Sequence, residues 1–178
     1  MISEIGEDDK KFLMKVAKDT LISKFLNEDL PSFYRFKKFY QEKFPIFIKL
    51  KINDNVRGYI GILEPKKDLI ETIQDLVIKT AFDDLRFEPL KKEEFENLKI
   101  EIFIIKNISP LKNIEDFKIE TNGLFIKSEN ATSIFFPGDL GTFDLNKSEY
   151  IKFALLKSGI PENSKNIEYY IVEFIKIE

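Results

Sequence analysis

The sequence contains no cysteine and no histidine among its 178 residues. Without cysteine the protein has no disulfide, no thiolate nucleophile and no cysteine ligand for zinc or an iron–sulfur cluster. Without histidine it lacks the commonest metal ligand and the commonest general base at neutral pH. Catalysis would have to use other side chains, backbone groups or a bound cofactor, and magnesium held by carboxylates stays open. The sequence therefore identifies neither a cofactor nor a reaction.

Long apolar segments are also absent from the sequence. No stretch of about 18 apolar residues is available to span a membrane. The opening residues, Met1-Ile2-Ser3-Glu4, lack the basic and then apolar pattern of a signal peptide. We therefore expect a soluble cytoplasmic protein. The net charge of −3 argues against a general nucleic-acid binder, because such proteins usually carry a basic surface.

Arginine is scarce in a chain that is rich in lysine. Only three of the 28 basic residues are arginines, namely Arg35, Arg57 and Arg86. Lysine suffices as a point charge, whereas the planar arginine head grips a carboxylate or phosphate with two parallel hydrogen bonds. This bias favours a specific role for each arginine, although three residues are few enough for chance to explain any one of them.

Hydrophobic periodicity predicts the main elements. Amphipathic helices are expected over residues 8–26, from the cap at Asp68 to Phe82, and from the cap at Asn146 to Gly159. In the last of these we expect the following residues to face inward: Tyr150, Ile151, Phe153, Ala154 and Leu156.

Alternation and turn chemistry predict the strands. They are a hairpin of 46–52 and 56–62 around Asn53-Asp54-Asn55, a central strand 98–105 ended by Ser109-Pro110, a hairpin of 124–126 and 133–136, and a central strand 167–177. A short helix is expected between Lys91 and Leu98. The fold class is α+β, with a mixed, largely antiparallel sheet and flanking helices in a single domain, residues 1–178.

Residues 32–44 interleave aromatic side chains with lysines. Such a pattern is compatible with RNA binding, because bases stack on aromatic rings beside cations. The alternative is that Phe33, Phe36 and Tyr40 cap the core from a loop or short helix. We favour the alternative because the chain as a whole is acidic.

The strand Val56–Ile62 carries two glycines in its interior. Strict alternation places Val56 on the face of Gly58 and leaves Arg57, Tyr59 and Gly61 on the other face. Glycine weakens a strand, so it usually marks a bulge or the close approach of a ligand or another backbone. Gly61 is therefore expected to leave space beside Arg57 and Tyr59.

A charged segment, Asp83-Asp84-Leu85-Arg86, follows the second helix directly. The two carboxylates could form a metal site, an acid–base pair or a local ion pair with Arg86. We favour the ion pair, in which Arg86 ties down the helix terminus.

Taken in order, several segments resemble the AMMECR domain family. Val-Arg-Gly-Tyr-Ile-Gly at 56–61 is similar to its Leu-Arg-Gly-Cys-Ile-Gly signature, and 81–90 is similar to its Ala-x-x-Asp-x-Arg-Phe-x-Pro segment. Further matches are Ile100-Glu101-Ile102, Ser109-Pro110, Asn122-Gly123-Leu124, Phe136-Pro137, Gly141-Thr142-Phe143-Asp144 and Lys157-Ser158-Gly159-Ile160-Pro161. The ordered set covers about residues 10–175, and it is the ordered set that carries the resemblance.

The resemblance implies an α+β fold with two unequal lobes and a cleft that the first signature lines. In prokaryotes the family is associated with a radical-SAM protein and a Memo-like protein, and its biochemical role is not settled. The chain departs from the family where Tyr59 replaces the signature cysteine, where Gly138 replaces a polar residue after Pro137, and where Phe143 replaces tryptophan. Tyr59 makes thiol chemistry impossible at that position.

These observations favour a binding or accessory protein with a cleft for a small anionic ligand or a partner segment. The predicted ligand-binding residues are Arg57, Gly58, Tyr59, Gly61, Asp84 and Arg86. The alternative is an enzyme that acts on a small anionic substrate without cysteine or histidine. An RNA-associated protein is the weaker alternative.

Overall fold

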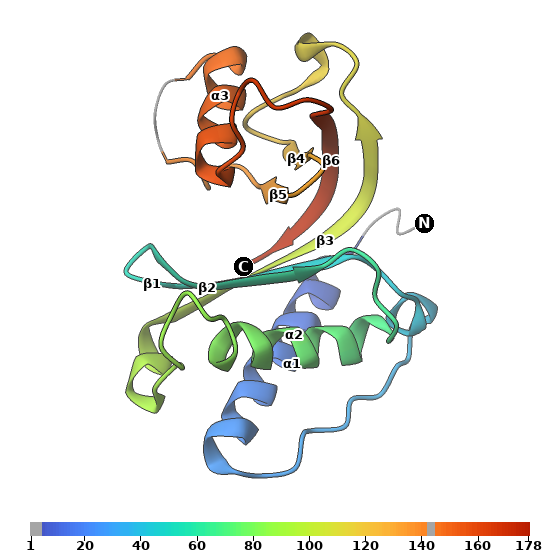
Figure 1. Ribbon diagram of the computed structural model, residues 1–178. Coiled ribbons are helices and arrows are strands. Elements are labelled where there is room, and N and C mark those ends of the chain that lie inside the picture. The colour runs from blue at the N-terminus through green and yellow to red at the C-terminus, as the bar shows by residue number, and fades with distance from the viewer. Residues whose placement is uncertain (1–4, 142–144) are drawn as a thin grey trace. The chain divides into compact units, whose positions relative to one another are not determined.

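The computed structural model describes residues 5–141 and 145–178 (Figure 1). Its helices are α1 (Glu7–Leu26), α2 (Leu69–Phe82) and α3 (Lys147–Ser158), with 3₁₀ helices η1 (Lys38–Gln41), η2 (Lys92–Asn97) and η3 (Ile114–Asp116). Its strands are β1 (Ile46–Ile52), β2 (Asn55–Ile62), β3 (Leu98–Pro110), β4 (Gly123–Lys127), β5 (Thr132–Phe135) and β6 (Glu168–Ile177). None of the described helices is long and apolar enough to cross a membrane.

The strands form one sheet in the order β2-β1-β3-β6-β4-β5. The pairs β1–β2, β1–β3, β4–β5 and β4–β6 are all antiparallel. The α+β class with a largely antiparallel sheet is therefore confirmed. The central positions predicted for β3 and β6 are also confirmed, because each has a neighbour on both sides.

The chain divides into two compact units. The first holds Met1–Ile105 and Ile175–Glu178, and the second holds Lys106–Phe174. Strands β3 and β6 contribute residues to both units. The predicted single domain and the cleft stay predictions.

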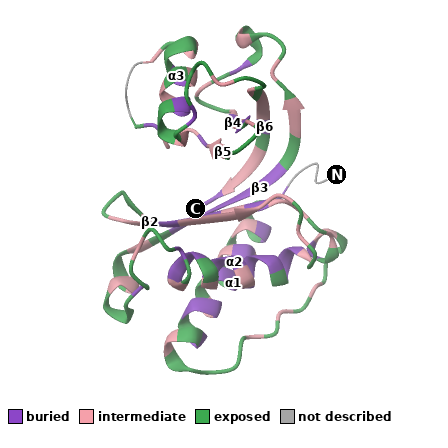
Figure 2. Ribbon diagram, in the orientation of Figure 1, coloured by how far each residue is buried: buried purple, intermediate pink, exposed green. Residues whose placement is uncertain are grey.

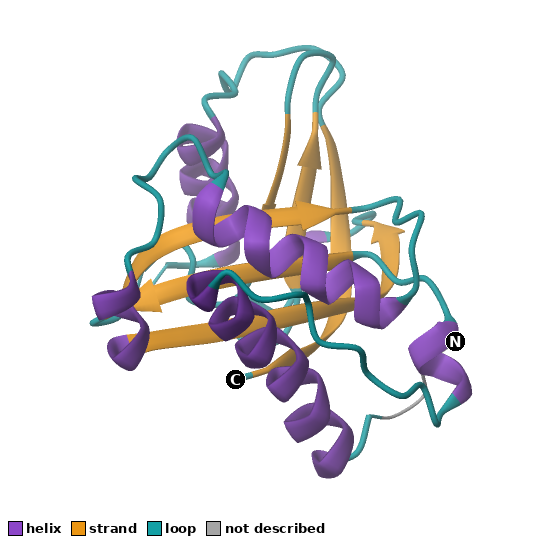
Figure 3. Ribbon diagram, turned by 90° about the horizontal axis from the view of Figure 1, so that it is seen from below, coloured by secondary structure: helices purple, strands orange, loops and turns teal. Residues whose placement is uncertain are grey.

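In the first unit, α1 and α2 pack together and α2 packs on β1 and β2 (Figure 3). The apolar stripes of these helices and one face of β1 form the core, as the buried segments in Figure 2 show, and its members include Leu13, Val16, Leu21, Ile73, Val77, Ile46, Ile48 and Leu50. The predicted cap of α2 is confirmed, because Asp68 accepts a 2.9 Å hydrogen bond from the Glu71 amide. Asn53 and Asp54 both have positive φ, which suits the tight turn between β1 and β2.

Segment 32–44 is attached to this core. The Tyr40 ring is fully buried, and its hydroxyl donates a 2.6 Å hydrogen bond to Asp9 at the start of α1. Phe12 of α1 lies 6.0 Å from Phe33, 5.5 Å from Phe36 and 5.1 Å from Tyr40, measured between ring centroids. The core-capping interpretation is therefore confirmed, although Phe36 keeps 56% of its surface exposed.

In the second unit, α3 packs near β5 and η3 around a smaller core. Asn146 caps the helix by accepting from the Glu149 amide at 3.0 Å, and Gly159 ends it with a φ of 67°, both as predicted. The prediction that Leu156 faces inward is wrong, because Leu156 is 73% exposed while Leu155 is buried. The buried stripe follows Tyr150, Ala154 and Leu155, and the next residue is rotated by a further 100°.

One strand boundary and one helix also differ from expectation. β3 continues past the expected end at residue 105, and it ends at Pro110, where Ser109-Pro110 was predicted to break it. Proline is tolerated there because the strand ends at that residue, where a missing amide hydrogen interrupts little of the ladder. The short helix expected from Lys91 is present as η2, which is 3₁₀ rather than α-helical.

Candidate functional site at the edge of β2

Strand β2 is an edge strand with a bulge at its signature arginine. Leu50 of β1 faces Gly58, but Lys51 faces Val56, so Arg57 is the extra residue of a β-bulge. The bulge corrects the predicted alternation, because it places Val56 on the face of Lys51 and leaves Gly58 on the buried face with Leu50. Strict alternation failed because it assumes that every residue of β2 has a partner.

The two glycines of the signature fill packing roles. A Cβ added at Gly58 would overlap the Thr80 carbonyl oxygen, so Gly58 lets α2 approach the backbone of β2. A Cβ added at Gly61 would overlap the Phe47 ring on the neighbouring strand. The space that we expected beside Arg57 and Tyr59 is therefore occupied, at Gly61, by the ring of Phe47.

Arg57 joins β2 to the segment that follows α2. Its guanidinium donates two parallel bonds to Glu94, with Nε to Oε1 at 2.8 Å and Nη2 to Oε2 at 3.0 Å. It also donates to the carbonyl oxygens of Glu88 at 2.7 Å and Pro89 at 3.3 Å. The side chain is only 17% exposed, so the planar head is used for an internal contact.

Asp84 is buried, and with Arg86 it pairs backbone hydrogen-bonding groups on the open edge of β2. Its Oδ2 accepts a 2.8 Å bond from the Tyr59 amide, and Arg86 donates to the carbonyl oxygen of Tyr59. An edge strand normally offers such groups to another strand, so this pair closes the edge at its middle. The favoured ion pair is present, with Arg86 Nη2 lying 2.8 Å from Asp84 Oδ2.

The same aspartate organises a tight turn. Asp84 Oδ1 accepts from the Arg86 amide at 3.2 Å and from Arg86 Nε at 2.9 Å, while the Phe87 amide donates to the Asp84 carbonyl at 2.9 Å. The turn displays Leu85 with its surface 100% exposed and the Arg86 side chain 61% exposed. We call residues 84–87 the Leu85 turn.

The electrostatics of these groups follow from their contacts. Burial acts to raise the pKa of Asp84, but the hydrogen bonds from Arg86 and the Tyr59 amide outweigh it and lower the pKa overall. The hydrogen bond to Asp84 raises the pKa of Arg86. The bond from Arg57 lowers the pKa of Glu94. All three groups are therefore charged at neutral pH, and Asp84 is a poor base because both of its oxygens accept hydrogen bonds.

The metal alternative for Asp83 and Asp84 has no geometric support. Across residues 5–141 and 145–178, no group of three or more acidic side chains is placed to hold a metal ion. Asp83 is exposed, whereas Asp84 is buried and bonded to Arg86.

The six predicted site residues lie in β2 and in the turn that bonds to its edge. The described contacts of Arg57, Gly58 and Asp84 are internal to the first unit.

Comparison with known proteins shows the family to which this chain belongs. Residues 14–176 match the AMMECR1 family. The chain belongs to the AMMECR1 family. A protein of Methanothermobacter thermautotrophicus is 25% identical over 88% of this chain and 85% of its own length. A protein of Nanoarchaeum equitans is 31% identical over 71% of this chain and 76% of its own length. The resemblance inferred from the motifs is confirmed.

A solved structure shares the AMMECR1 fold seen here. The crystal structure of the uncharacterised protein PH0010 from Pyrococcus horikoshii is similar with a TM-score of 0.84. The likeness covers 97% of this chain and 92% of that one at 20% sequence identity. At that identity the comparison shows the fold alone.

The structure describes the neighbours of two residues that depart from the AMMECR1 signatures, Tyr59 and Gly138. The Tyr59 ring lies 6.1 Å from the Phe47 ring and 5.2 Å from Lys49 Nζ, so the larger side chain is packed against β1. Gly138 has a φ of 88° with open space at its Cβ position, a conformation that glycine adopts without strain. Phe143 and the rest of the 142–144 motif lie outside the described residues.

Sequence reasoning missed a buried charge cluster on β1 and β3. Lys49 and Glu101 face each other in the register and are 4% and 7% exposed, with Lys49 Nζ 3.5 Å from the Glu101 carboxylate. Lys176 lies 3.0 Å and Lys51 3.6 Å from the same carboxylate. Burial acts to raise the pKa of Glu101, but the lysines lower it overall. Lysines alternating with isoleucine and leucine in β1 were the available signal, and the register was needed to pair them.

Proposed function

We propose that this AMMECR1-family protein is a binding or accessory protein that presents the Leu85 turn to a protein partner. The observation that carries the proposal is the full exposure of Leu85 in a turn whose position is fixed. Apolar side chains of monomeric proteins are often exposed singly, so exposure alone means little. Here the exposed leucine lies in a turn held by hydrogen bonds to Asp84, next to an exposed arginine.

The turn is suited to docking because it is already ordered. Association is weakened when loops must be immobilised, and a prepared turn avoids much of that cost. Asp84 holds the turn through the Tyr59 amide and the Arg86 side chain. A leucine beside an arginine offers a partner an apolar anchor and a charged group close together, and arginine is enriched at binding hot spots.

Arg86 also supports the anionic part of the proposal. Its Nε and Nη2 bond to Asp84 and Tyr59, and no hydrogen bond from Nη1 is found within the part of the chain that the structure describes. That edge of the guanidinium is free to take a carboxylate of a partner segment. Arg57 contributes less, because Glu94 and two carbonyl oxygens occupy its donors.

An enzyme acting on a small anionic substrate has less support than a binding role. Asp84 and Glu94 at the edge of β2 are used in ion pairs, and the chain has no histidine or cysteine to replace them. RNA association has less support still, because Phe33 and Tyr40 of segment 32–44 pack on the core. The partners that the family suggests are the radical-SAM and Memo-like proteins, in the cytoplasm.

Binding of purified partners tests the proposal. We expect a radical-SAM or Memo-like protein from the same organism to bind the wild-type chain and to bind Leu85→Glu at least about tenfold more weakly. Leu156→Glu is the matched control, because it places the same charge at another exposed leucine. Biolayer interferometry measures the dissociation constants. The proposal fails if neither protein binds, if Leu85→Glu binds like wild type, or if the control loses as much affinity.

A further inference from the structure

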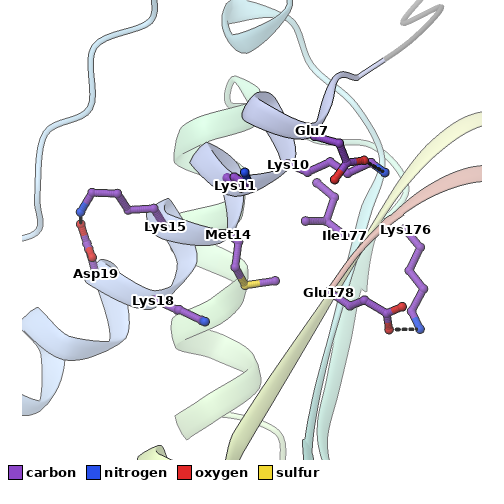
Figure 4. Close-up of a pocket in the computed structure, with 10 residues that line it drawn as sticks. All are labelled: Glu7, Lys10, Lys11, Met14, Lys15, Lys18, Asp19, Lys176, Ile177 and Glu178. Atoms are coloured by element: carbon purple, nitrogen blue, oxygen red, sulfur yellow. Dashed lines mark hydrogen bonds and ion pairs between the residues drawn. The ribbon is translucent and has the colours of Figure 1, made fainter.

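A hollow of about 580 Å³ lies beside α1, close to the end of β6 (Figure 4). It is far from the signature segments in sequence and includes none of their residues. Five lysines line it, namely Lys10, Lys11, Lys15, Lys18 and Lys176. The other lining residues are Glu7, Asp19, Glu178, Met14 and Ile177. We call it the lysine hollow.

The carboxylates of the lysine hollow are already paired. The pairs are Lys10 with Glu7 at 2.7 Å, Lys15 with Asp19, and Lys176 with Glu178 at 2.6 Å. Lys11 and Lys18 are exposed, and within residues 5–141 and 145–178 neither forms an ion pair, although Lys11 is near enough to Glu7 to help lower its pKa. The hollow is thus lined by five lysines and three carboxylates, and Lys176 also pairs with Glu101, so the unpaired positive charge comes from Lys11 and Lys18, in a chain whose net charge is −3.

The floor of the hollow is apolar. Met14 is half-buried, Ile177 is buried, and both lie between the lysines in Figure 4. A second hollow of about 390 Å³ shares Met14, Lys18 and Glu178 with the first, and its other lining residues are Leu98, Lys99, Ile100 and Glu101. Lys18 thus stands at the boundary of both hollows, beside an apolar surface that a ring or alkyl group could cover.

We propose that the lysine hollow binds a small organic phosphate. Its volume lies in the range of small-molecule sites, roughly 300–1,000 Å³. Lysine binds a phosphate as a compact point charge, without the fixed fork by which arginine grips a carboxylate or phosphate, so several lysines can gather around one phosphate group. The phosphate contacts Lys11 and Lys18, and the organic group lies on Met14. The proposal is independent of the Leu85 turn.

Calorimetric titration with ADP and with inorganic pyrophosphate at low salt tests the proposal. ADP carries a diphosphate joined to adenosine, whose flat adenine ring can cover Met14, so we expect it to bind more tightly than pyrophosphate. Lys11→Gln/Lys18→Gln is expected to weaken ADP binding about tenfold, since two exposed charges are removed. Lys112→Gln/Lys152→Gln is the control, because it removes the same charge from two exposed lysines of the second unit and leaves the hollow intact.

Thermal unfolding of both variants should match the wild type, because all four lysines are exposed. The proposal is overturned if the wild type does not bind ADP up to about 10 mM. It is also overturned if the control loses as much affinity as the hollow variant, since that would mean a general charge effect. Equal affinities for ADP and pyrophosphate would overturn the contact with Met14.

Discussion

Single residues of the signature segments act mainly through the groups that surround them. Gly58 and Gly61 both lie where a Cβ would collide, but with different partners. Beside Gly58 the obstacle is the backbone carbonyl of Thr80, which belongs to α2 and moves only with the helix. Beside Gly61 the obstacle is the side chain of Phe47, which a substitution can shorten. The two glycines therefore respond differently to compensating changes.

Gly58→Ala is expected to destabilise the protein by about 2 kcal/mol, because the added methyl overpacks the contact between α2 and β2. Gly61→Ala is expected to cost a similar amount, but Phe47→Ala should relieve it. The double variant Gly61→Ala/Phe47→Ala should then be more stable than the sum of the single effects implies. Urea unfolding monitored by circular dichroism gives the free energies. A Gly58→Ala protein as stable as wild type would contradict the packing argument.

At the scale of elements, one side chain connects β2 to η2 and the segment before it. Arg57 bonds to Glu94 in η2 and to the carbonyl oxygens of Glu88 and Pro89. Glu94 in turn accepts a 2.8 Å bond from the Lys91 amide. These contacts attach residues 88–94 to the edge strand, and they hold a segment whose helix has only 3₁₀ geometry.

Arg57→Lys is expected to loosen this segment and to cost about 2 kcal/mol, since lysine cannot reproduce the parallel bonds to Glu94. Amide hydrogen exchange should accelerate over residues 88–97 and stay unchanged in α3. Arg35→Lys is the control, because Arg35 makes a comparable pair with Asp68 and Glu71 elsewhere in the first unit. Equal protection of 88–97 in wild type and Arg57→Lys would show that the arginine is not what holds the segment.

At the scale of the whole molecule, stability depends on several carboxylates whose pKa is lowered in the folded state. They are Asp9, Asp84, Glu94 and Glu101. A depressed folded pKa contributes stability above the unfolded value, near 3.8 for Asp and 4.5 for Glu, and that stability is lost as the pH falls through the folded pKa. Burial raises the pKa of Tyr150 to about 12, so its contribution is present below pH 10 and is lost as the pH rises toward 12.

The free energy of unfolding should therefore be steady near neutral pH and fall progressively below about pH 5. Urea unfolding at a series of pH values between 7 and 3 measures the change. Asp84→Asn should be less stable at pH 7 and should lose less on acidification, because one of the contributing carboxylates is gone. A constant free energy of unfolding across this range would rule out the ionised carboxylates as a source of stability.

The sequence by itself determined the local features of this protein. Several features depend on residues that lie close together in the chain, so they can be predicted without a structure. They are the helix caps at Asp68 and Asn146, the turn at 53–55 and the ordered family motifs. The absence of cysteine and histidine likewise limited the chemistry from the start. Those features led to the correct fold class and family.

Only the tertiary structure decided what the signature residues contact. The bulge at Arg57 depends on register, the pairing of Arg57 with Glu94 spans 37 positions, and the exposure of Leu85 depends on how Asp84 meets β2. The periodicity of a strand shows which residues share a face, but not which strand or loop lies beside it. Side-chain partners distant in sequence follow from packing, and packing is a property of the whole fold.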